Sequence, residues 1–175
     1  RMGGTSFQAR NLALGVDIWS RMLEGEVTIF LGLAGAMVPA GMRRLIVYLI
    51  ENRLIDCLVS TGANLFHDLH ETLGRAHWQG SAQADDRELA EAKTFRIYDV
   101  YASEEEFDRT EQFVVDFAAR LELDRPYTTR EFFYVLGKEL AGEAGEDGIL
   151  TAAAKAEVPV FCPAPADSVY GTALA

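Results

Sequence analysis

A short stretch, Thr61 to Asp68, combines residue types that could bind a ligand and transfer protons. The preceding run, residues 55–60, is apolar enough for a buried strand, and residues 65–73 have helical spacing. Small residues at a strand-to-helix turn let backbone N–H groups approach a ligand, and a helix N-terminus favours an anion. This stretch is therefore the first candidate for a binding site.

The same layout occurs at Thr28–Pro39 and again at Val158–Asp167. Three strand ends followed by small or turn-forming residues predict one crevice at the rim of an α/β sheet. Gly32 and Gly35 lack the third glycine of a dinucleotide fingerprint, so a plain tight turn competes with a phosphate cradle. Asp167 could hydrogen-bond ribose hydroxyls, but the pattern alone favours a helix cap.

Histidines follow the second strand. His67 and Glu71 are spaced i, i+4, and His67 and His70 i, i+3, so the three share a helical face. A metal centre would need further ligands, and His77 is the remaining histidine of the chain. An imidazole lining a ligand crevice fits His67 better, and His70 and His77 could instead be solvated surface residues.

The elements around these residues form two consecutive β-loop-α units, which predict a right-handed parallel sheet. We expect strands at 27–31, 55–60 and 158–162, and helices at 11–23, 42–51, 65–73, 103–121, 128–140 and 149–156. Residues 74–93 look irregular, and residues 95–101 look extended. The phenylalanines at 107, 113, 117, 132 and 133 should face the core.

Composition limits the class of protein. An apolar content of 49%, a charged content of 25% and a net charge of −11 indicate one soluble domain without a nucleic-acid face. No apolar run approaches the roughly 20 residues of a membrane helix, and no signal peptide is visible. Cys57 and Cys162 fit buried thiols in a reducing compartment. We therefore expect a cytoplasmic protein.

Four blocks resemble the deoxyhypusine synthase family in order and spacing. They are Gly4–Leu12 (GTSFQARNL), Thr28–Gly32 (TIFLG), Ser60–Ala63 (STGA) and Val158–Ala164 (VPVFCPA). The His67-Asp68 pair and Gly171-Thr172 are closer to the archaeal branch. The resemblance implies a Rossmann-like parallel α/β fold with flanking helices, and a tetramer whose active sites lie between subunits.

The family uses NAD to oxidise spermidine and moves the aminobutyl group, through a lysine imine, onto one lysine of a translation-factor precursor. By the resemblance, the residues that bind NAD are Gly35, Ala36, Met37, Val38, Pro39, Thr61, Gly62, Ala63 and Asp167. Phe66 and His67 fall where the family contacts the polyamine and the nicotinamide end.

Some positions depart from the family pattern. Gly35-Ala36 replaces a Ser-Asn pair, so backbone groups must replace side-chain hydrogen bonds to NAD. Acidic polyamine contacts become His67 and Thr172, which leaves polyamine specificity open. A relative that transfers the same group to putrescine, making homospermidine, is therefore the first alternative.

Residues 1–175 resemble only the N-terminal part of one NAD-binding domain of this family. The segment with the imine-forming lysine is absent, and Lys93, Lys138 and Lys155 have no matching context. We expect catalysis to require a complementary C-terminal chain or fragment, in a homo- or hetero-tetramer. A non-catalytic nucleotide-binding subunit is the second alternative.

Overall fold

The computed structural model describes residues 2–122 and 124–175. Its α-helices are α1 (Gln8–Glu24), α2 (Arg43–Glu51), α3 (Gly62–Thr72), α4 (Asp86–Glu91), α5 (Glu104–Ala118), α6 (Thr129–Leu140), α7 (Ile149–Ala156) and α8 (Val169–Ala173). Its strands are β1 (Phe30–Leu33), β2 (Cys57–Ser60), β3 (His77–Gln79), β4 (Thr94–Ile97), β5 (Val100–Ser103) and β6 (Val160–Phe161).

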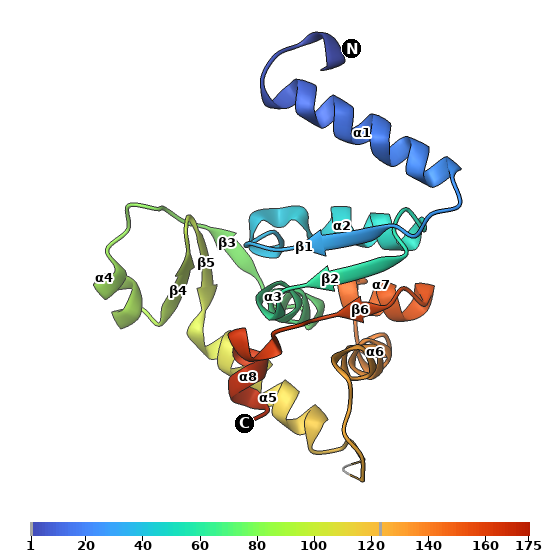
Figure 1. Cartoon of the computed structure of the whole chain (residues 1–175). Coiled ribbons are helices and arrows are strands. Elements are labelled where there is room, and N and C mark those ends of the chain that lie inside the picture. Colours follow the sequence, from blue (N-terminus) through green and yellow to red (C-terminus); the bar gives the residue numbers. More distant parts are fainter. Residues whose placement is uncertain (1, 123) are drawn as a thin grey trace.

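A parallel three-stranded sheet with the order β1-β2-β6 organises the molecule. Phe30 is in register with Cys57, and Leu58 with Val160, so the carboxyl ends of all three strands lie at one edge (Figure 1). The mixed α/β architecture with a parallel sheet confirms that part of the predicted fold. The first strand begins at Phe30 and not at residue 27 as expected, because Val27 and Thr28 precede the segment that pairs with β2.

Strands β3, β5 and β4 form a second, antiparallel sheet, and α4 packs against β4. Residues 74–93, predicted to be irregular, contain β3 and α4 and were mispredicted, whereas most of the extended run expected at residues 95–101 lies in β4 and β5. Tyr98 has a left-handed backbone (φ 58°) in the two-residue turn between β4 and β5. Such turns usually contain Asn or Gly, and their absence here hid the hairpin in the sequence.

The core lies between the parallel sheet and the central helices. Helix α6 packs on α7 and β6, α7 packs on α2 and α3, and α3 packs on α5 and α8. Phe117, Phe132 and Phe133 are buried, while Phe107 and Phe113 are partly buried against the same core, as expected. Both cysteines are free and buried, also as expected.

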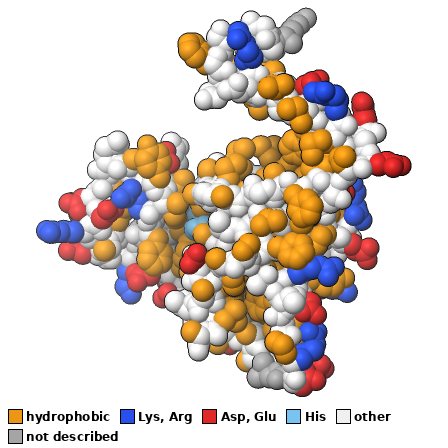
Figure 2. Space-filling model, in the orientation of Figure 1, with side chains coloured by type: hydrophobic (Ala, Val, Ile, Leu, Met, Phe, Trp, Pro, Cys, Tyr) orange, Lys and Arg blue, Asp and Glu red, His pale blue; other side chains and the backbone are white. Residues whose placement is uncertain are grey.

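Helix α1 extends away from the rest of the molecule (Figure 1). None of its residues is buried, and apolar side chains along it remain exposed, which Figure 2 shows as a hydrophobic strip. Trp19 anchors its second half by donating its indole N–H to the carbonyl of Leu54 at 3.0 Å. Within the described residues, no helix combines the length and apolarity needed to cross a membrane.

Candidate functional site at the strand ends

The turns after β1 and β2 and the segment after β6 meet at the carboxyl edge of the parallel sheet. The N–H of Thr61 donates to the carbonyl of Leu33 at 3.2 Å, which joins the first two turns directly. Five of the residues predicted to bind NAD are exposed there, namely Gly35, Ala36, Thr61, Ala63 and Asp167. The structure therefore brings the three predicted turns together.

Asn64 holds the first two turns in place. This fully buried side chain accepts a hydrogen bond from the N–H of Val38 (3.2 Å) and donates to the hydroxyl of Thr61 (3.1 Å). Thr61 in turn caps α3 by accepting from the N–H of Asn64. The sequence prediction missed Asn64, although an amide four residues into such a turn is well suited to this bridging role.

Gly62 connects the second turn to the third. A Cβ at this position would lie 2.4 Å from the hydroxyl oxygen of Ser168 and 3.2 Å from the carbonyl oxygen of Pro165. Only glycine permits this approach. The helix-cap interpretation of Asp167 was wrong, because Ser168 and not Asp167 occupies the N-cap position of α8.

Backbone geometry at the first turn suits an anionic ligand. Gly35 has a left-handed backbone (φ 70°), and the N–H groups of Gly35 and Ala36 have no hydrogen-bond partner among the described residues. Met37 is half-buried, whereas Val38 and Pro39 are buried and support the turn from beneath. Exposed N–H groups of this kind fit the phosphates of a dinucleotide.

The two residues predicted to contact the polyamine lie on α3. His67 is half-buried, but Phe66 is 1% exposed and packs edge-on against Phe107 and Tyr170. A direct contact between substrate and the Phe66 ring would require this packing to open. Phe66 thus supports the helix that carries His67.

Two hydrogen bonds link His67, His77 and Glu71 into a chain. Nδ1 of His67 lies 2.9 Å from Nε2 of His77, and Nδ1 of His77 lies 2.8 Å from a carboxylate oxygen of Glu71. The other carboxylate oxygen of Glu71 is 3.7 Å from Nε of Arg43. Figure 2 shows a small patch of histidine surface between the antiparallel sheet and the main body.

The alternative that His70 and His77 are solvated surface residues is excluded by their burial. The side chain of His70 is 0% exposed and that of His77 is 4% exposed. Nδ1 of His70 hydrogen-bonds the hydroxyl of Thr110 at 2.9 Å, and Arg75 also donates to that hydroxyl. Burial is the main reason that the pKa of His70 falls to about 3 and that of His67 to about 4. Both imidazoles are therefore neutral at pH 7.

Asp68 has a structural role beneath this cluster. Its fully buried carboxylate accepts from Nε of Arg43 (2.9 Å) and from the N–H groups of Ile149 (2.7 Å) and Leu150 (3.0 Å). Burial raises the pKa of Asp68, while Arg43 and the two N–H groups oppose that shift. Asp68 thereby binds the start of α7 to α3 rather than facing the site.

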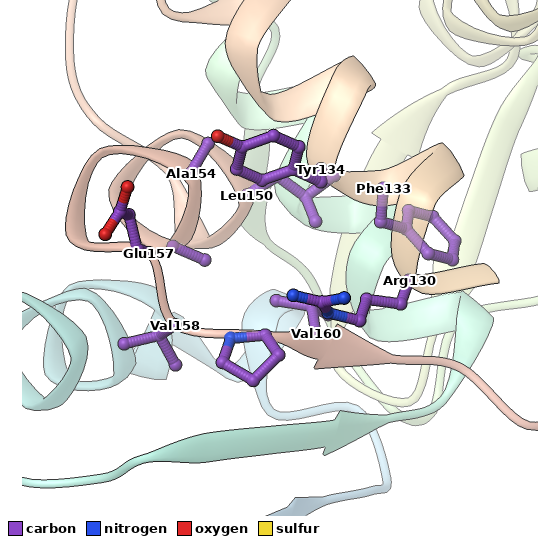
Figure 3. Close-up of a pocket in the computed structure, with 10 residues that line it drawn as sticks. Arg130, Phe133, Tyr134, Leu150, Ala154, Glu157, Val158 and Val160 are labelled. Carbon is purple, nitrogen blue, oxygen red and sulfur yellow. The ribbon is translucent and has the colours of Figure 1, made fainter. Parts of the chain in front are cut away.

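Two cavities differ in whether a residue of the site predicted at this edge of the sheet lines them. One, of about 380 Å³, is lined by Pro39, Ala40, Gly41, His77, Trp78, Gln79, Asp99 and Val100. The other, of about 410 Å³, lies between α6, α7 and β6, with Arg130, Tyr134 and Glu157 around it (Figure 3). Only the first includes a predicted site residue. No group of three or more potential metal-ligating side chains occurs in the described part of the chain.

Comparison with known proteins identifies the family. The deoxyhypusine synthase family model matches residues 1–175. The chain is 54% identical to "probable deoxyhypusine synthase 2" of Methanosarcina mazei, covering 97% of this chain and 50% of that protein. It is 45% identical to the protein of the same name from Archaeoglobus fulgidus, covering 99% and 58%. The chain belongs to the deoxyhypusine synthase family.

The fold agrees with this membership. A crystal structure from Entamoeba histolytica, assigned as a deoxyhypusine synthase, superposes with a TM-score of 0.72 at 22% identity. The match covers 98% of this chain and 58% of that one. The chain thus spans only about half the length of the curated family members it matches.

Proposed function

We propose that this chain supplies the NAD-binding half of a deoxyhypusine synthase-like aminobutyltransferase. Spermidine is oxidised with NAD as hydride acceptor, and its aminobutyl group passes through a lysine imine to a lysine of the translation-factor precursor. Residues 1–175 bind the dinucleotide, and they orient the polyamine beside it. The imine-forming lysine lies outside residues 1–175, and the active enzyme is a tetramer.

The convergence of three strand-end turns carries this proposal. Dinucleotides bind where the carboxyl ends of parallel strands meet. Here the N–H groups of Gly35 and Ala36, unpaired among the described residues, would donate to phosphate oxygens, and the hydroxyl of Thr61 and the carboxylate of Asp167 would accept from ribose hydroxyls. Bound NAD would supply the hydride acceptor.

His67 is the candidate base of the polyamine site. It is neutral at pH 7 and half-buried, in the middle of α3, the helix that follows the second turn. A neutral imidazole can accept a proton from an ammonium group, which an amine must lose before its carbon can release hydride. The chain's lysines are not needed for this step, and Lys155 is paired with Asp147.

The cofactor-binding part of the proposal is tested by NAD affinity. Replacing Asp167 by Asn should weaken NAD binding about 10- to 100-fold, because a hydrogen bond to a charged group contributes about 1.5–3 kcal/mol. Isothermal titration calorimetry on the full protein measures this change. Asp116→Asn, an exposed substitution on α5, serves as the matched control. Equal affinities of the two variants would contradict the assignment of Asp167.

The transfer reaction is tested with two acceptors. The full protein, with any complementary chain that it requires, should form NADH from NAD when spermidine is added. It should then transfer the aminobutyl group to the precursor protein rather than to putrescine. Transfer to putrescine alone would indicate the homospermidine-forming alternative, and NAD binding without NADH formation would indicate a non-catalytic subunit.

A further inference from the structure

The chain of hydrogen bonds from Glu71 to His67 has a direction. An ionised carboxylate only accepts hydrogen bonds, so Nδ1 of His77 must donate to Glu71. Nε2 of His77 then carries a lone pair and accepts from Nδ1 of His67. This leaves a lone pair on Nε2 of His67, which has no hydrogen-bond partner among the described residues.

The elements around the chain hold it in this arrangement. Glu71 and His67 are one helical turn apart on α3, and His77 comes from β3 of the antiparallel sheet. Nε of Arg43 lies 3.7 Å from the other carboxylate oxygen of Glu71. The rings of His67 and His77 both lie against Phe107, with centroids 5.5 and 6.4 Å away. The mispredicted antiparallel sheet thus delivers the middle member of the chain.

We propose that Glu71 and His77 are positioning residues that make His67 the proton acceptor for an alkylammonium substrate. This inference rests on the proposed polyamine site. When a substrate ammonium loses its proton, its N–H bond breaks and an Nε2–H bond forms on His67. The Nδ1 proton of His67 can then pass to Nε2 of His77. The positive charge ends on His77, where it faces the carboxylate of Glu71.

The geometry explains how a neutral, half-buried His67 can act as a base. Burial and the nearby His77 lower the pKa of His67 to about 4, so a charge confined to His67 is disfavoured. Moving the charge to His77 places it 2.8 Å from a carboxylate oxygen. The other charged or titratable groups around this hydrogen-bonded chain of side chains are Arg43, Asp68, His70, Arg75, Asp99 and Glu106.

The decisive test is the tautomer of His67, which does not depend on catalysis. In the ¹⁵N-histidine-labelled full protein, solid-state NMR should show a protonated Nδ1 and an unprotonated Nε2 for His67 and a protonated Nδ1 for His77. Signals are assigned by their loss in His67→Gln and His77→Gln. In Glu71→Gln the new amide can donate as well as accept, so both histidines should shift toward the Nε2–H tautomer. A wild-type His67 with its proton on Nε2 would overturn the proposal.

The kinetics of a Glu71 variant distinguish a role in proton transfer from a purely structural role. Glu71→Gln should lower kcat for spermidine-dependent NADH formation about 100-fold, the lower end of general-base effects, with little change in KM. The acid limb of its pH profile should move to lower pH, because the anion that favours imidazolium is lost. Glu71→Asp should restore part of the rate. Glu106→Gln, whose carboxylate lies 4.0 Å from His70, is the control and should retain both rate and profile.

The outcomes distinguish the two levels of inference. Equal kcat and pH profiles for the wild type and Glu71→Gln would overturn the relay while leaving the aminobutyl transfer intact. If the tautomers are as expected but the wild type forms no NADH with spermidine, the proposed function fails, and the assignment of an alkylammonium donor fails with it.

Discussion

At the scale of single residues, the buried carboxylate of Asp68 shows how a chemically suggestive motif can be structural. Its neighbour His67 hydrogen-bonds His77 of the antiparallel sheet, whereas Asp68 accepts hydrogen bonds from Arg43 and from the start of α7. Arg43 also donates to Thr72 at 2.8 Å. Breaking such a buried pair leaves an uncompensated charge, which is strongly destabilising.

Gly148 provides a test of how tightly this network is packed. A Cβ there would lie 2.1 Å from the hydroxyl oxygen of Thr72 and 2.7 Å from Asp68. Gly148→Ala should therefore lower the free energy of unfolding by about 1–3 kcal/mol, the usual range for overpacking. Urea unfolding of the full protein measures it. Gly145→Ala, with nothing within 4 Å of its Cβ, should change stability by less than about 0.5 kcal/mol. Equal effects of the two substitutions would argue against this packing.

At the scale of elements, side-chain caps fix where two helices begin. Ser103 and Thr128 each accept a hydrogen bond from the backbone three residues on, and α5 and α6 begin directly after them. Only Thr128 completes a reciprocal capping box, with Glu131. The pairing of Glu131 with the N–H and hydroxyl of Thr128 also lowers the pKa of its carboxyl group.

Thr128→Ala should consequently destabilise the protein by about 1 kcal/mol, because the N–H of Glu131 loses its acceptor and the carboxylate of Glu131 loses the hydroxyl donor. The melting temperature of the full protein by calorimetry reports the loss. Thr129→Ala is the neighbouring control, since no side-chain hydrogen bond of Thr129 occurs among the described residues, and its melting temperature should stay close to that of the wild type. A drop in Thr129→Ala as large as in Thr128→Ala would show that the cap is not the cause.

The limits of the sequence prediction follow from the same physics. Apolar runs located the three parallel strands, and small residues located the turns after them, because both signals are local. The β4–β5 hairpin lacks the glycine or asparagine that would indicate a turn at Tyr98. The pairing of His67 with His77 depends on where the antiparallel sheet docks, and no spacing within the sequence encodes that distance.

At the scale of the whole molecule, two buried neutral histidines couple stability to pH. The folded pKa values of His67 and His70 are about 4 and about 3, against an ordinary value of 6.5. Between these limits the unfolded chain binds more protons than the folded one, so stability rises with pH. The contribution of these two histidines to the free energy of unfolding is thus fully present above pH 6.5, and it decreases progressively as the pH falls toward 4.

The free energy of unfolding, measured by urea at pH 7.5, 6.0 and 5.0, should therefore decrease along that series. His70→Gln keeps a hydrogen-bonding side chain beside Thr110 but cannot titrate, so its stability should fall less steeply over the same range. The paired carboxylates of Asp86 and Glu131 have lowered pKa values and contribute only at more acidic pH. Parallel pH dependences for the variant and the wild type would exclude His70 as a source.

The order of the parallel sheet also bears on biosynthesis. Leu58 of the central strand pairs with Val160, and more than half of the chain lies between them in the sequence. During translation, β1 and β2 can pair soon after they leave the ribosome, but the other edge of β2 stays open until β6 emerges. That interval exposes an apolar strand edge in the nascent polypeptide, so the late arrival of β6 is the step at which a chaperone would have most to protect.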